Sequence, residues 1–215
     1  MNIVRLPTGP LGTNTYIVYR ECEVEETPCV VIDPAASLPV IKKLRELGLK
    51  CTHILLTHGH FDHIMGVKKL KESEGAEVCI HSADAEALGG GKGSLAYMAG
   101  AFVEPCEVDK RLADGDEFAA AGFDFRVIST PGHTPGGVCY LIENEKVVFT
   151  GDTLFRLSVG RTDLAGGDGE QLYESILYRL FSLKGDYRLL PGHEEDSTLD
   201  YERKFNPYMK NGGIY

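Results

Sequence analysis

The sequence lacks long apolar runs, paired cysteines and a leader of the secretory type. No apolar run approaches the roughly 20 residues that a membrane-spanning helix needs. Residues 1–7 do not show the basic-then-apolar pattern of a signal peptide. The six cysteines form no C-x-x-C pair, and Cys29, Cys51, Cys79 and Cys139 lie among apolar residues, as buried side chains do in a reducing compartment. We therefore expect a cytoplasmic protein that does not enter a membrane.

Basic residues are also scarce relative to acidic ones. Lys and Arg together number 22 and Asp and Glu 32, which gives a formal net charge of −10. Such a surface repels phosphate backbones, so nucleic acid is not an expected partner. No repeat, linker or low-complexity block interrupts the 215 residues, a length that suits one hydrophobic core. We expect a single domain over residues 1–215, and the sequence makes no prediction about oligomeric state.

Hydrophobic patterning predicts strands and helices along the whole chain. Short apolar runs predict strands at residues 16–19, 29–32, 53–56, 77–80, 123–128, 138–142, 146–149 and 187–190. Apolar residues at helical spacing predict helices over residues 37–47, about 62 to 75, 82–88 with a Ser82 cap, and around 172–180. An acidic hairpin over residues 21–27 joins the first two strands. Because hairpins outnumber strand–helix–strand units, we expect an α/β (α+β) chain with two mixed or antiparallel sheets and helices outside them.

A dense cluster of histidines directly follows the strand expected at residues 53–56. Three imidazoles and one carboxylate fall within six positions, in the run His58-Gly59-His60-Phe61-Asp62-His63. Imidazoles packed this closely would repel one another if protonated and would add no apolar packing if neutral. Neutral imidazole and carboxylate are natural ligands of Zn²⁺ and Fe²⁺. The cluster therefore predicts a metal site rather than part of the core.

Four further polar residues stand just past an apolar strand. They are Asp33, His133, Asp152 and His193, and each lies beside a Gly or Pro that lets the backbone turn sharply. We expect these side chains to meet the histidine cluster at one edge of the sheets. For Asp33 two interpretations stay open: it orients a metal-bound histidine, or it is a turn residue before Pro34.

Together these segments resemble the metallo-β-lactamase superfamily. Within it they are most similar to a short form of the glyoxalase II-like (hydroxyacylglutathione hydrolase-like) enzymes, without an additional C-terminal domain. Besides the histidine cluster, the resemblance is carried by Pro131-Gly132-His133-Thr134-Pro135-Gly136, Phe149-Thr150-Gly151-Asp152-Thr153-Leu154-Phe155 and Pro191-Gly192-His193. It extends over nearly the whole chain and implies a four-layer αββα sandwich, with the site along one edge of the two sheets.

The resemblance also implies a two-metal centre. By position, one metal would be held by His58, His60 and His133, the other by Asp62, His63 and His193, with Asp152 bridging both. Seven donors suit two metals with open coordination positions better than one closed structural site. Two metals can share a hydroxide that attacks a carbonyl carbon while one of them polarises the carbonyl oxygen. Asp62 and Asp152 are then the catalytic carboxylates, and we expect two divalent ions, zinc first, with iron or manganese as alternatives.

The family likeness implies a thioester substrate such as S-D-lactoylglutathione. A thiol with a pKa near 8.5 departs as a thiolate without a strong general acid, and none is evident near the ligands. Arg161 is a candidate for binding a substrate carboxylate, although an ion pair with Asp163 explains it equally well. The expected partner is thus a small thioester, with a glutathione conjugate as one form.

A second interpretation of the same ligands is that the protein is a persulfide dioxygenase. The segment Gly160-Arg161-Thr162-Asp163 resembles the corresponding segment of those enzymes. Such an enzyme would use one iron held by His58, His133 and Asp152. A full second set of ligands has little use in such a site, which favours the hydrolase. A scaffold protein would have lost ligands, and β-lactamase, lactonase or nuclease activity remains compatible with the resemblance, the last disfavoured by the negative charge.

The remaining conspicuous residues have ordinary explanations. The run from 88 to 94 lacks the order of a phosphate-binding loop, because Gly93 stands where Ser or Thr is needed. We expect instead a mobile loop near the mouth of the site, with Tyr97 and Met98 as candidate substrate contacts. His53 and His81 are interpreted as structural histidines.

Overall fold

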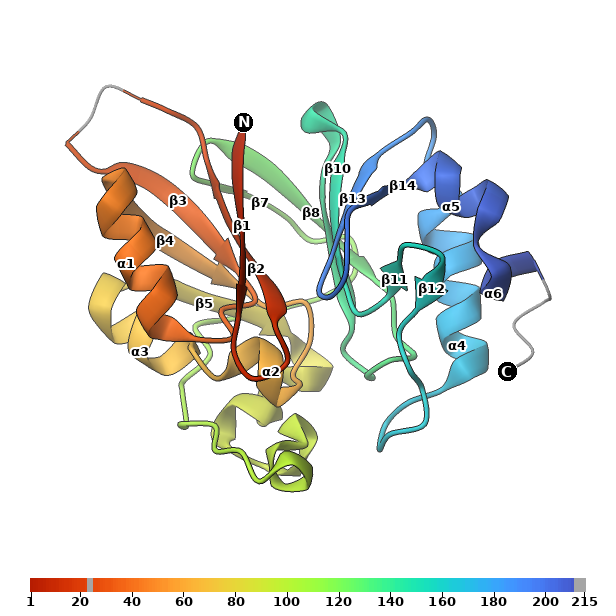
Figure 1. Cartoon of the computed structure of the whole chain (residues 1–215), viewed down its shortest axis with the longest axis horizontal. Helices are drawn as coiled ribbons and strands as arrows, with labels where there is room; N and C mark the ends of the chain where they lie inside the picture. The colour runs from red at the N-terminus through yellow and green to blue at the C-terminus, as the bar shows by residue number, and fades with distance from the viewer. Residues whose placement is uncertain (23–24, 211–215) are drawn as a thin grey trace.

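The computed structural model describes residues 1–22 and 25–210 and contains two six-stranded sheets that face each other (Figure 1). The first has the order β1 (Asn2–Thr8), β2 (Thr13–Tyr19), β3 (Thr27–Ile32), β4 (Leu49–Leu55), β5 (Glu77–His81) and β6 (Lys110–Leu112). Its first three strands are antiparallel, and β3 to β6 are parallel. Residues 23–24 of the expected acidic hairpin lie outside the described residues.

The second sheet is antiparallel except at one pair. Its order is β14 (Ser197–Thr198), β13 (Arg188–Pro191), β10 (Val147–Gly151), β9 (Val138–Ile142), β8 (Phe123–Ser129) and β7 (Glu117–Ala120). Only β10 and β13 run parallel. A small hairpin of β11 (Leu154–Phe155) and β12 (Ser158–Val159) lies beside it. Both sheets are therefore mixed, as expected.

Helices cover the outer faces of the two sheets. On the first lie α1 (Ser37–Leu47) and α3 (Val67–Glu74), and on the second α4 (Gly169–Glu174), the π-helical η5 (Ser175–Leu180), α5 (Leu199–Phe205) and α6 (Pro207–Lys210) (Figure 1). The expected four-layer arrangement of helices, sheet, sheet and helices is confirmed. Among the described residues, no helix is long and apolar enough to cross a membrane.

Three apolar clusters fill the spaces between these layers. Alternate residues of one strand point to opposite faces, so Ile17 of β2 packs towards α1 and α3 while Tyr16 and Val18 pack between the sheets. In β10, Phe149 faces the other sheet and Val148 faces α4 and η5. The four cysteines expected to be buried are buried, and no cysteine is in a disulfide.

One helix expectation is confirmed and another is wrong. α1 matches the expected range and ends at Gly48, which adopts the left-handed conformation (φ 64°) that terminates helices. The single helix expected from about 62 to 75 is instead split into α2 (Phe61–Ile64) and α3. A Cβ on Gly66 would lie 2.5 Å from the carbonyl oxygen of Pro34, so this glycine lets the chain pass against the turn after β3.

The segment after β5 also differs from expectation. It forms three 3₁₀ helices, η1 (Ser82–Gly89), η2 (Lys92–Ser94) and η3 (Ala96–Ala99), rather than a short helix followed by a loop. Ser82 is not the cap, because its hydroxyl donates to the carbonyl of Leu112. The imidazole of His81 caps η1 instead, accepting from the backbone N–H of Ala83 at 3.3 Å. This segment lies at the end of the first sheet that carries the histidine cluster (Figure 1).

Candidate metal centre

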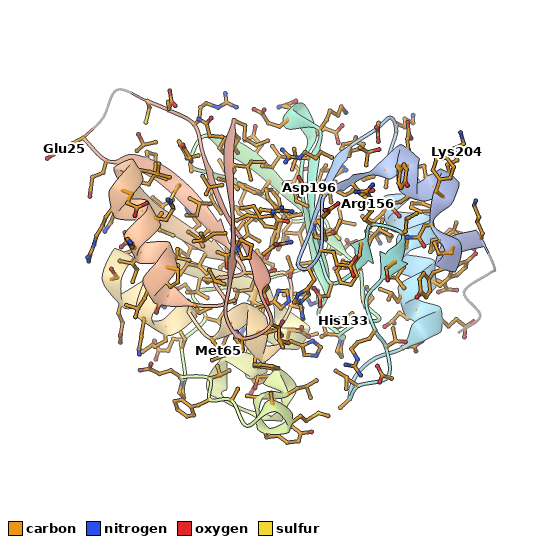
Figure 2. All side chains as sticks on the ribbon, in the orientation of Figure 1. Glu25, Met65, His133, Arg156, Asp196 and Lys204 are labelled. Atoms are coloured by element: carbon orange, nitrogen blue, oxygen red, sulfur yellow. The ribbon has the colours of Figure 1, made fainter. Side chains whose placement is uncertain are left out.

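The structure brings all seven expected donors to one edge of the sandwich. Four of them follow β4: His58 and His60 lie in the turn that leads into α2, and Asp62 and His63 lie in α2 itself. The other three are His133 after β8, Asp152 after β10 and His193 after β13. The loops that carry them belong to both sheets, and Figure 2 shows His133 between the two halves of the molecule. Six of the seven residues are nearly buried, and His193 is the most exposed, at 24% of its side chain.

The donors form two groups that share an aspartate. His58, His60 and His133 have ligand atoms within 4.8 Å of one another, and so do Asp62, His63 and His193. In the first group His60 Nδ1 lies 2.8 Å from His133 Nε2. In the second, His193 Nε2 lies 3.2 Å from Asp62 Oδ2.

Asp152 lies between these two groups. Its Oδ1 is 3.4 Å from His63 Nε2, and its Oδ2 is 3.6 Å from both His133 Nε2 and His193 Nε2. One carboxylate therefore reaches donors of both groups. This is the position expected for a residue that bridges two ions.

Several donor atoms are buried without a hydrogen-bond partner. Among the described residues only four buried side-chain polar atoms lack one, and three of them are His58 Nε2, His63 Nε2 and Asp152 Oδ1. Burying a polar atom without a partner is unfavourable, so native structures rarely tolerate it without another ligand. These atoms come from His58, His63 and Asp152, a third set whose ligand atoms lie within 4.8 Å of one another and which connects the two groups. The residues present therefore fit bound divalent metal.

The electrostatics of the site favour the metal-binding forms of four donors. Burial and neighbouring imidazoles hold the pKa of His58 well below its usual range, and burial with His133 lowers the pKa of His60 to about 3. Burial raises the pKa of Asp62 and of Asp152, but His63 and the other neighbouring histidines together outweigh it, and the net shift is downward for both carboxyls. Neutral imidazoles and ionised carboxylates are the forms that bind divalent metals. For His63 and His193 burial lowers the pKa, but the neighbouring carboxylates together outweigh burial and the pKa of both is raised.

Three of the histidines are oriented by a second partner. Asp33 Oδ2 accepts from His63 Nδ1 at 2.9 Å, so His63 Nε2 points towards Asp62 and Asp152. His133 Nδ1 donates to the backbone carbonyl of Arg161 at 2.7 Å. The hydroxyl of Thr57 lies 3.1 Å from His58 Nδ1. Such partners fix the ring orientation of ligating histidines, so of the two interpretations of Asp33 the structure supports the orienting one.

Asp84 joins two of the loops that carry the donors, and it was not predicted from the sequence. This carboxylate, buried in η1, accepts from the backbone N–H of Gly59 at 2.8 Å and from the hydroxyl of Thr134 and the N–H of Gly136, both at 2.7 Å. It thereby joins the loop of His58 and His60 to the loop of His133. Its partners lie 25 to 52 residues away in the chain, so no local pattern could have revealed them.

A second missed contact supports the other end of the site. The buried hydroxyl of Thr13 donates to Asp62 Oδ2 at 3.0 Å, and the Asn14 side chain donates to the carbonyls of Pro191 and Glu194, which flank His193. Both residues lie at the start of β2. Their partners lie 49 to 180 residues away in the chain, so a pattern of neighbouring residues does not reveal these contacts.

A cavity of about 550 Å³ opens beside the donors. Half of its lining residues are apolar: Leu11, Phe61, Leu95, Met98, Ala99, Phe155, Val159 and Leu164. The other half are five of the donors, His60, Asp62, His133, Asp152 and His193, and three further polar residues, Ser158, Arg161 and Glu194. Met98 is thus placed where a substrate contact was expected, whereas Tyr97 is not among the lining residues. A cavity of this size accommodates a small organic substrate.

Arg161 lies at the rim of this cavity and is already paired. Its guanidinium donates two hydrogen bonds of 2.8 Å to Asp163, and both side chains are largely exposed. The ion pair that the sequence allowed is therefore present. The backbone of Arg161, through its bond to His133, contacts the donor set directly.

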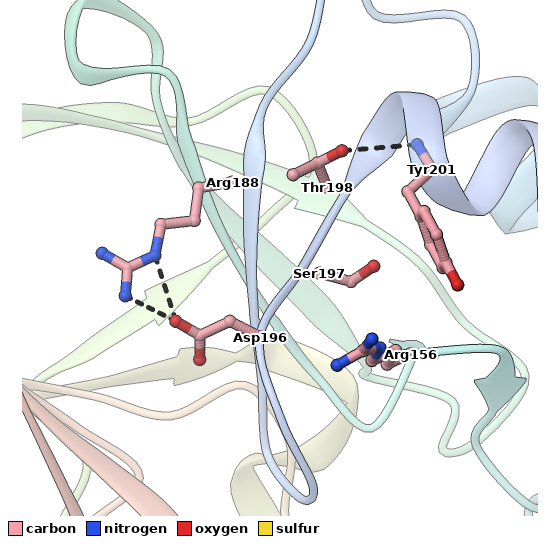
Figure 3. A pocket seen from close by; sticks show the side chains of 6 residues that line it. All are labelled: Arg156, Arg188, Asp196, Ser197, Thr198 and Tyr201. Atoms are coloured by element: carbon pink, nitrogen blue, oxygen red, sulfur yellow. Dashed lines mark hydrogen bonds and ion pairs between the residues drawn. The ribbon is translucent and has the colours of Figure 1, made fainter.

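A second cavity lies away from the donors, beside β13, β14 and α5 (Figure 3). It measures about 530 Å³ and is lined by Arg156, Arg188, Asp196, Ser197, Thr198 and Tyr201. Arg188 is hydrogen-bonded to Asp196, and Arg156 to Glu195. With no imidazole or thiol and one carboxylate already in an ion pair, this cavity offers no metal-binding group, so the candidate active site is the first cavity.

Comparison with known proteins agrees with this geometry. The family model described as "Metallo-beta-lactamase superfamily" matches residues 8–193, which include every donor named above. The chain belongs to the metallo-β-lactamase superfamily. Members of this superfamily are typically metal-dependent hydrolases, so divalent metal is the expected occupant of the donor groups.

Individual relatives match over nearly their full length. Hydroxyacylglutathione hydrolase GloC of Haemophilus influenzae is 33% identical over 218 residues, which cover 98% of this chain and 99% of the relative. The crystal structure of BLEG-1 B3 metallo-beta-lactamase superimposes with a TM-score of 0.87 at 32% identity, over 97% of this chain and 99% of the other. TTHA1623 in a di-iron-bound form gives 0.83 at 36% identity, over 95% and 99%. The metallo-β-lactamase fold is thereby confirmed.

Proposed function

We propose that this protein is a two-metal hydrolase of thioesters, with S-D-lactoylglutathione as a substrate. The observation that carries the proposal is the pair of buried donor groups that share Asp152. The relative named hydroxyacylglutathione hydrolase supports the substrate class. His58, His60 and His133 would hold one ion, Asp62, His63 and His193 the other, and Asp152 both; zinc is the proposed metal, with iron or manganese as alternatives.

The reaction is the addition of water across a C–S bond. A water oxygen bonds to the acyl carbon, the electron pair of the C–S bond leaves with sulfur, and the products at neutral pH are a carboxylate, a thiol and one proton. When bound, two divalent metals supply a nucleophilic hydroxide at neutral pH and a Lewis acid for the carbonyl oxygen. Because a thiol leaves readily as a thiolate, this reaction does not depend on a strong general acid.

Other residues of the chain hold the metal-binding side chains in position and shape the space for the acyl group. Thr13 and His193 hold the carboxylate of Asp62 in place, and Asp33 holds the ring of His63. The apolar side chains around the cavity exclude bulk water from the acyl group. The alternative with a single iron on His58, His133 and Asp152 would leave the second donor group without a role.

The decisive experiment is metal analysis of the purified protein beside a hydrolysis assay with S-D-lactoylglutathione. We expect close to two divalent metals per chain and release of free thiol. One iron per chain, together with oxygen consumption on glutathione persulfide and no thioester hydrolysis, would replace the hydrolase with the dioxygenase.

The variant Asp152→Ala tests the shared carboxylate. It should abolish hydrolysis and lower the metal content, because both donor groups lose a ligand. Asp124→Ala is the matched control, since Asp124 is an exposed aspartate of β8 outside the site. Full retention of activity and metal in Asp152→Ala would contradict the bridging role.

A further inference from the structure

The walls of the candidate active site are more apolar than a small polar acyl group requires. Leu11 comes from the turn between β1 and β2, Phe61 from α2, Met98 from η3, Phe155 from β11 and Leu164 from the loop after β12. Five separate segments thus each direct a large apolar side chain at the same cavity. A cavity with an apolar wall and a few convergent polar groups is the usual form of a small-molecule site.

Two of these side chains are left largely in water. Leu11 is 59% exposed and Met98 is 58% exposed, and both line the same cavity. Contiguous apolar surface of this kind is unfavourable for a protein in solution, and it commonly marks a binding site. An apolar ligand in the cavity would remove both side chains from water.

The backbone beside Met98 is held in an unfavourable conformation. Leu95 lines the cavity with φ 57°, in the left-handed region that leucine rarely adopts. The N–H of Met98 donates to the carbonyl of Leu95 at 3.0 Å, so this turn and η3 form one unit. Strain of this kind persists where the surrounding structure imposes it and is concentrated at ligand-binding sites.

The charges at the cavity do not favour a charged acyl group. Among its lining residues whose side chains the structure describes, Arg161 is the one Lys or Arg, and Asp163 already holds it with two hydrogen bonds of 2.8 Å. Glu194 adds a carboxylate at the rim. An acyl group with its own carboxylate would therefore meet no unpaired cation on this wall.

We infer that the preferred acyl group is an apolar chain of several carbons, longer than lactoyl and without its hydroxyl. This rests on the proposed thioester hydrolysis. The metal centre would take the thioester carbonyl, and the chain would lie against Leu11, Phe61 and Met98. Burial of each methylene is worth about 0.8 kcal/mol, which corresponds to about a fourfold gain in kcat/KM per added methylene until the chain fills the cavity.

The test holds the carrier constant and varies the acyl group. The metal-loaded full-length enzyme is assayed with S-acetyl-, S-butanoyl-, S-hexanoyl- and S-D-lactoylglutathione. We expect kcat/KM to rise by roughly tenfold or more from acetyl to butanoyl, to rise again to hexanoyl, and to exceed the lactoyl value. The variant Met98→Ser should flatten this rise. Leu38→Ser replaces another exposed apolar residue, 77% exposed and outside the cavity, and should retain it.

The outcomes separate this inference from the proposed function. Hydrolysis of all four thioesters with no dependence on chain length, or with lactoyl as the best substrate, would overturn the inference and leave thioester hydrolysis intact. An unchanged chain-length dependence in Met98→Ser would overturn the assignment of the acyl chain to this wall. Failure to hydrolyse any of the four by enzyme carrying two metals would overturn both.

Discussion

The carboxylates at this site have different roles, which follow from the atoms that each of them contacts. Asp62 and Asp152 lie against Nε2 atoms of the donor histidines, and Asp33 accepts from the other ring nitrogen, Nδ1, of His63. Asp84 instead contacts the loops that carry the donor histidines. The donors could be predicted because histidines are rare and seldom crowd together without a ligand. Asp84 could not be predicted, since an isolated aspartate after a strand is ordinarily a turn or cap residue.

Replacing Asp84 should weaken the metal centre without removing a donor. In Asp84→Ala the N–H groups of Gly59 and Gly136 and the hydroxyl of Thr134 lose their acceptor inside the protein. We expect metal affinity to fall by about 10- to 100-fold, as for other residues that orient ligands. Titration of the metal-free protein with zinc measures this.

The stability of the same variant provides a second readout. Each buried donor left without an acceptor costs about 1–3 kcal/mol. The free energy of unfolding of Asp84→Ala, measured by urea unfolding, should therefore be lower than that of the unaltered protein. Asp124→Ala, at an exposed position on β8, is the control for loss of a carboxylate. Zinc affinity equal to that of the unaltered protein would show that Asp84 does not position the two loops.

Elements with a regular apolar pattern and a local stop signal were predictable from the sequence. The α1 helix and β9 match their expected bounds because Val40 and Leu44 repeat at helical spacing and residues 138–142 form a short apolar run. β1 was missed because it is an edge strand that contains Pro7 and alternates poorly in burial. The break between α2 and α3 was missed because its cause is a contact with the turn after β3.

Gly66 should be intolerant of a side chain for that reason. A Cβ at this position would lie 2.5 Å from the carbonyl oxygen of Pro34 and 2.7 Å from the backbone of Ala36, and backbone cannot rotate away as a side chain can. We expect Gly66→Ala to destabilise the protein by about 1–3 kcal/mol, the usual range for overpacking. Urea unfolding followed by circular dichroism measures the change.

Gly89, the last residue of η1, provides the control for Gly66→Ala. Gly89→Ala adds the same methyl group where no heavy atom lies within 4 Å and the backbone is not left-handed. It should leave stability within about 0.5 kcal/mol of the original, as most surface substitutions do. Equal stability of the two variants would mean that the α2–α3 break tolerates a side chain and that another feature causes it.

At the scale of the whole molecule, the donor groups connect the two sheets. His58 and His60 come from the first sheet and His133 from the second, and likewise Asp62 and His63 from the first and His193 from the second. Few backbone hydrogen bonds join the sheets at this edge; examples are those from Val138 N to Thr57 O at 2.8 Å and from Asn14 N to Gly192 O at 2.7 Å. The layered fold could be predicted from strand order and patterning, but this pairing of sheets depends on side chains far apart in the sequence.

Metal bound at this edge should therefore stabilise the whole molecule. A ligand present at 100 times its dissociation constant adds about 2.7 kcal/mol to the free energy of unfolding. For a chain of this length, about 1 kcal/mol shifts Tm by roughly 2–4 °C, so each occupied site should raise Tm by roughly 5–10 °C. The measurement is thermal unfolding of the chelator-treated protein with and without added zinc. His193→Ala, which removes a donor of one group, should retain part of the increase, whereas His53→Ala, outside the site, should retain all of it. If zinc left Tm unchanged in the unaltered protein, the donor groups would not link the two sheets through metal.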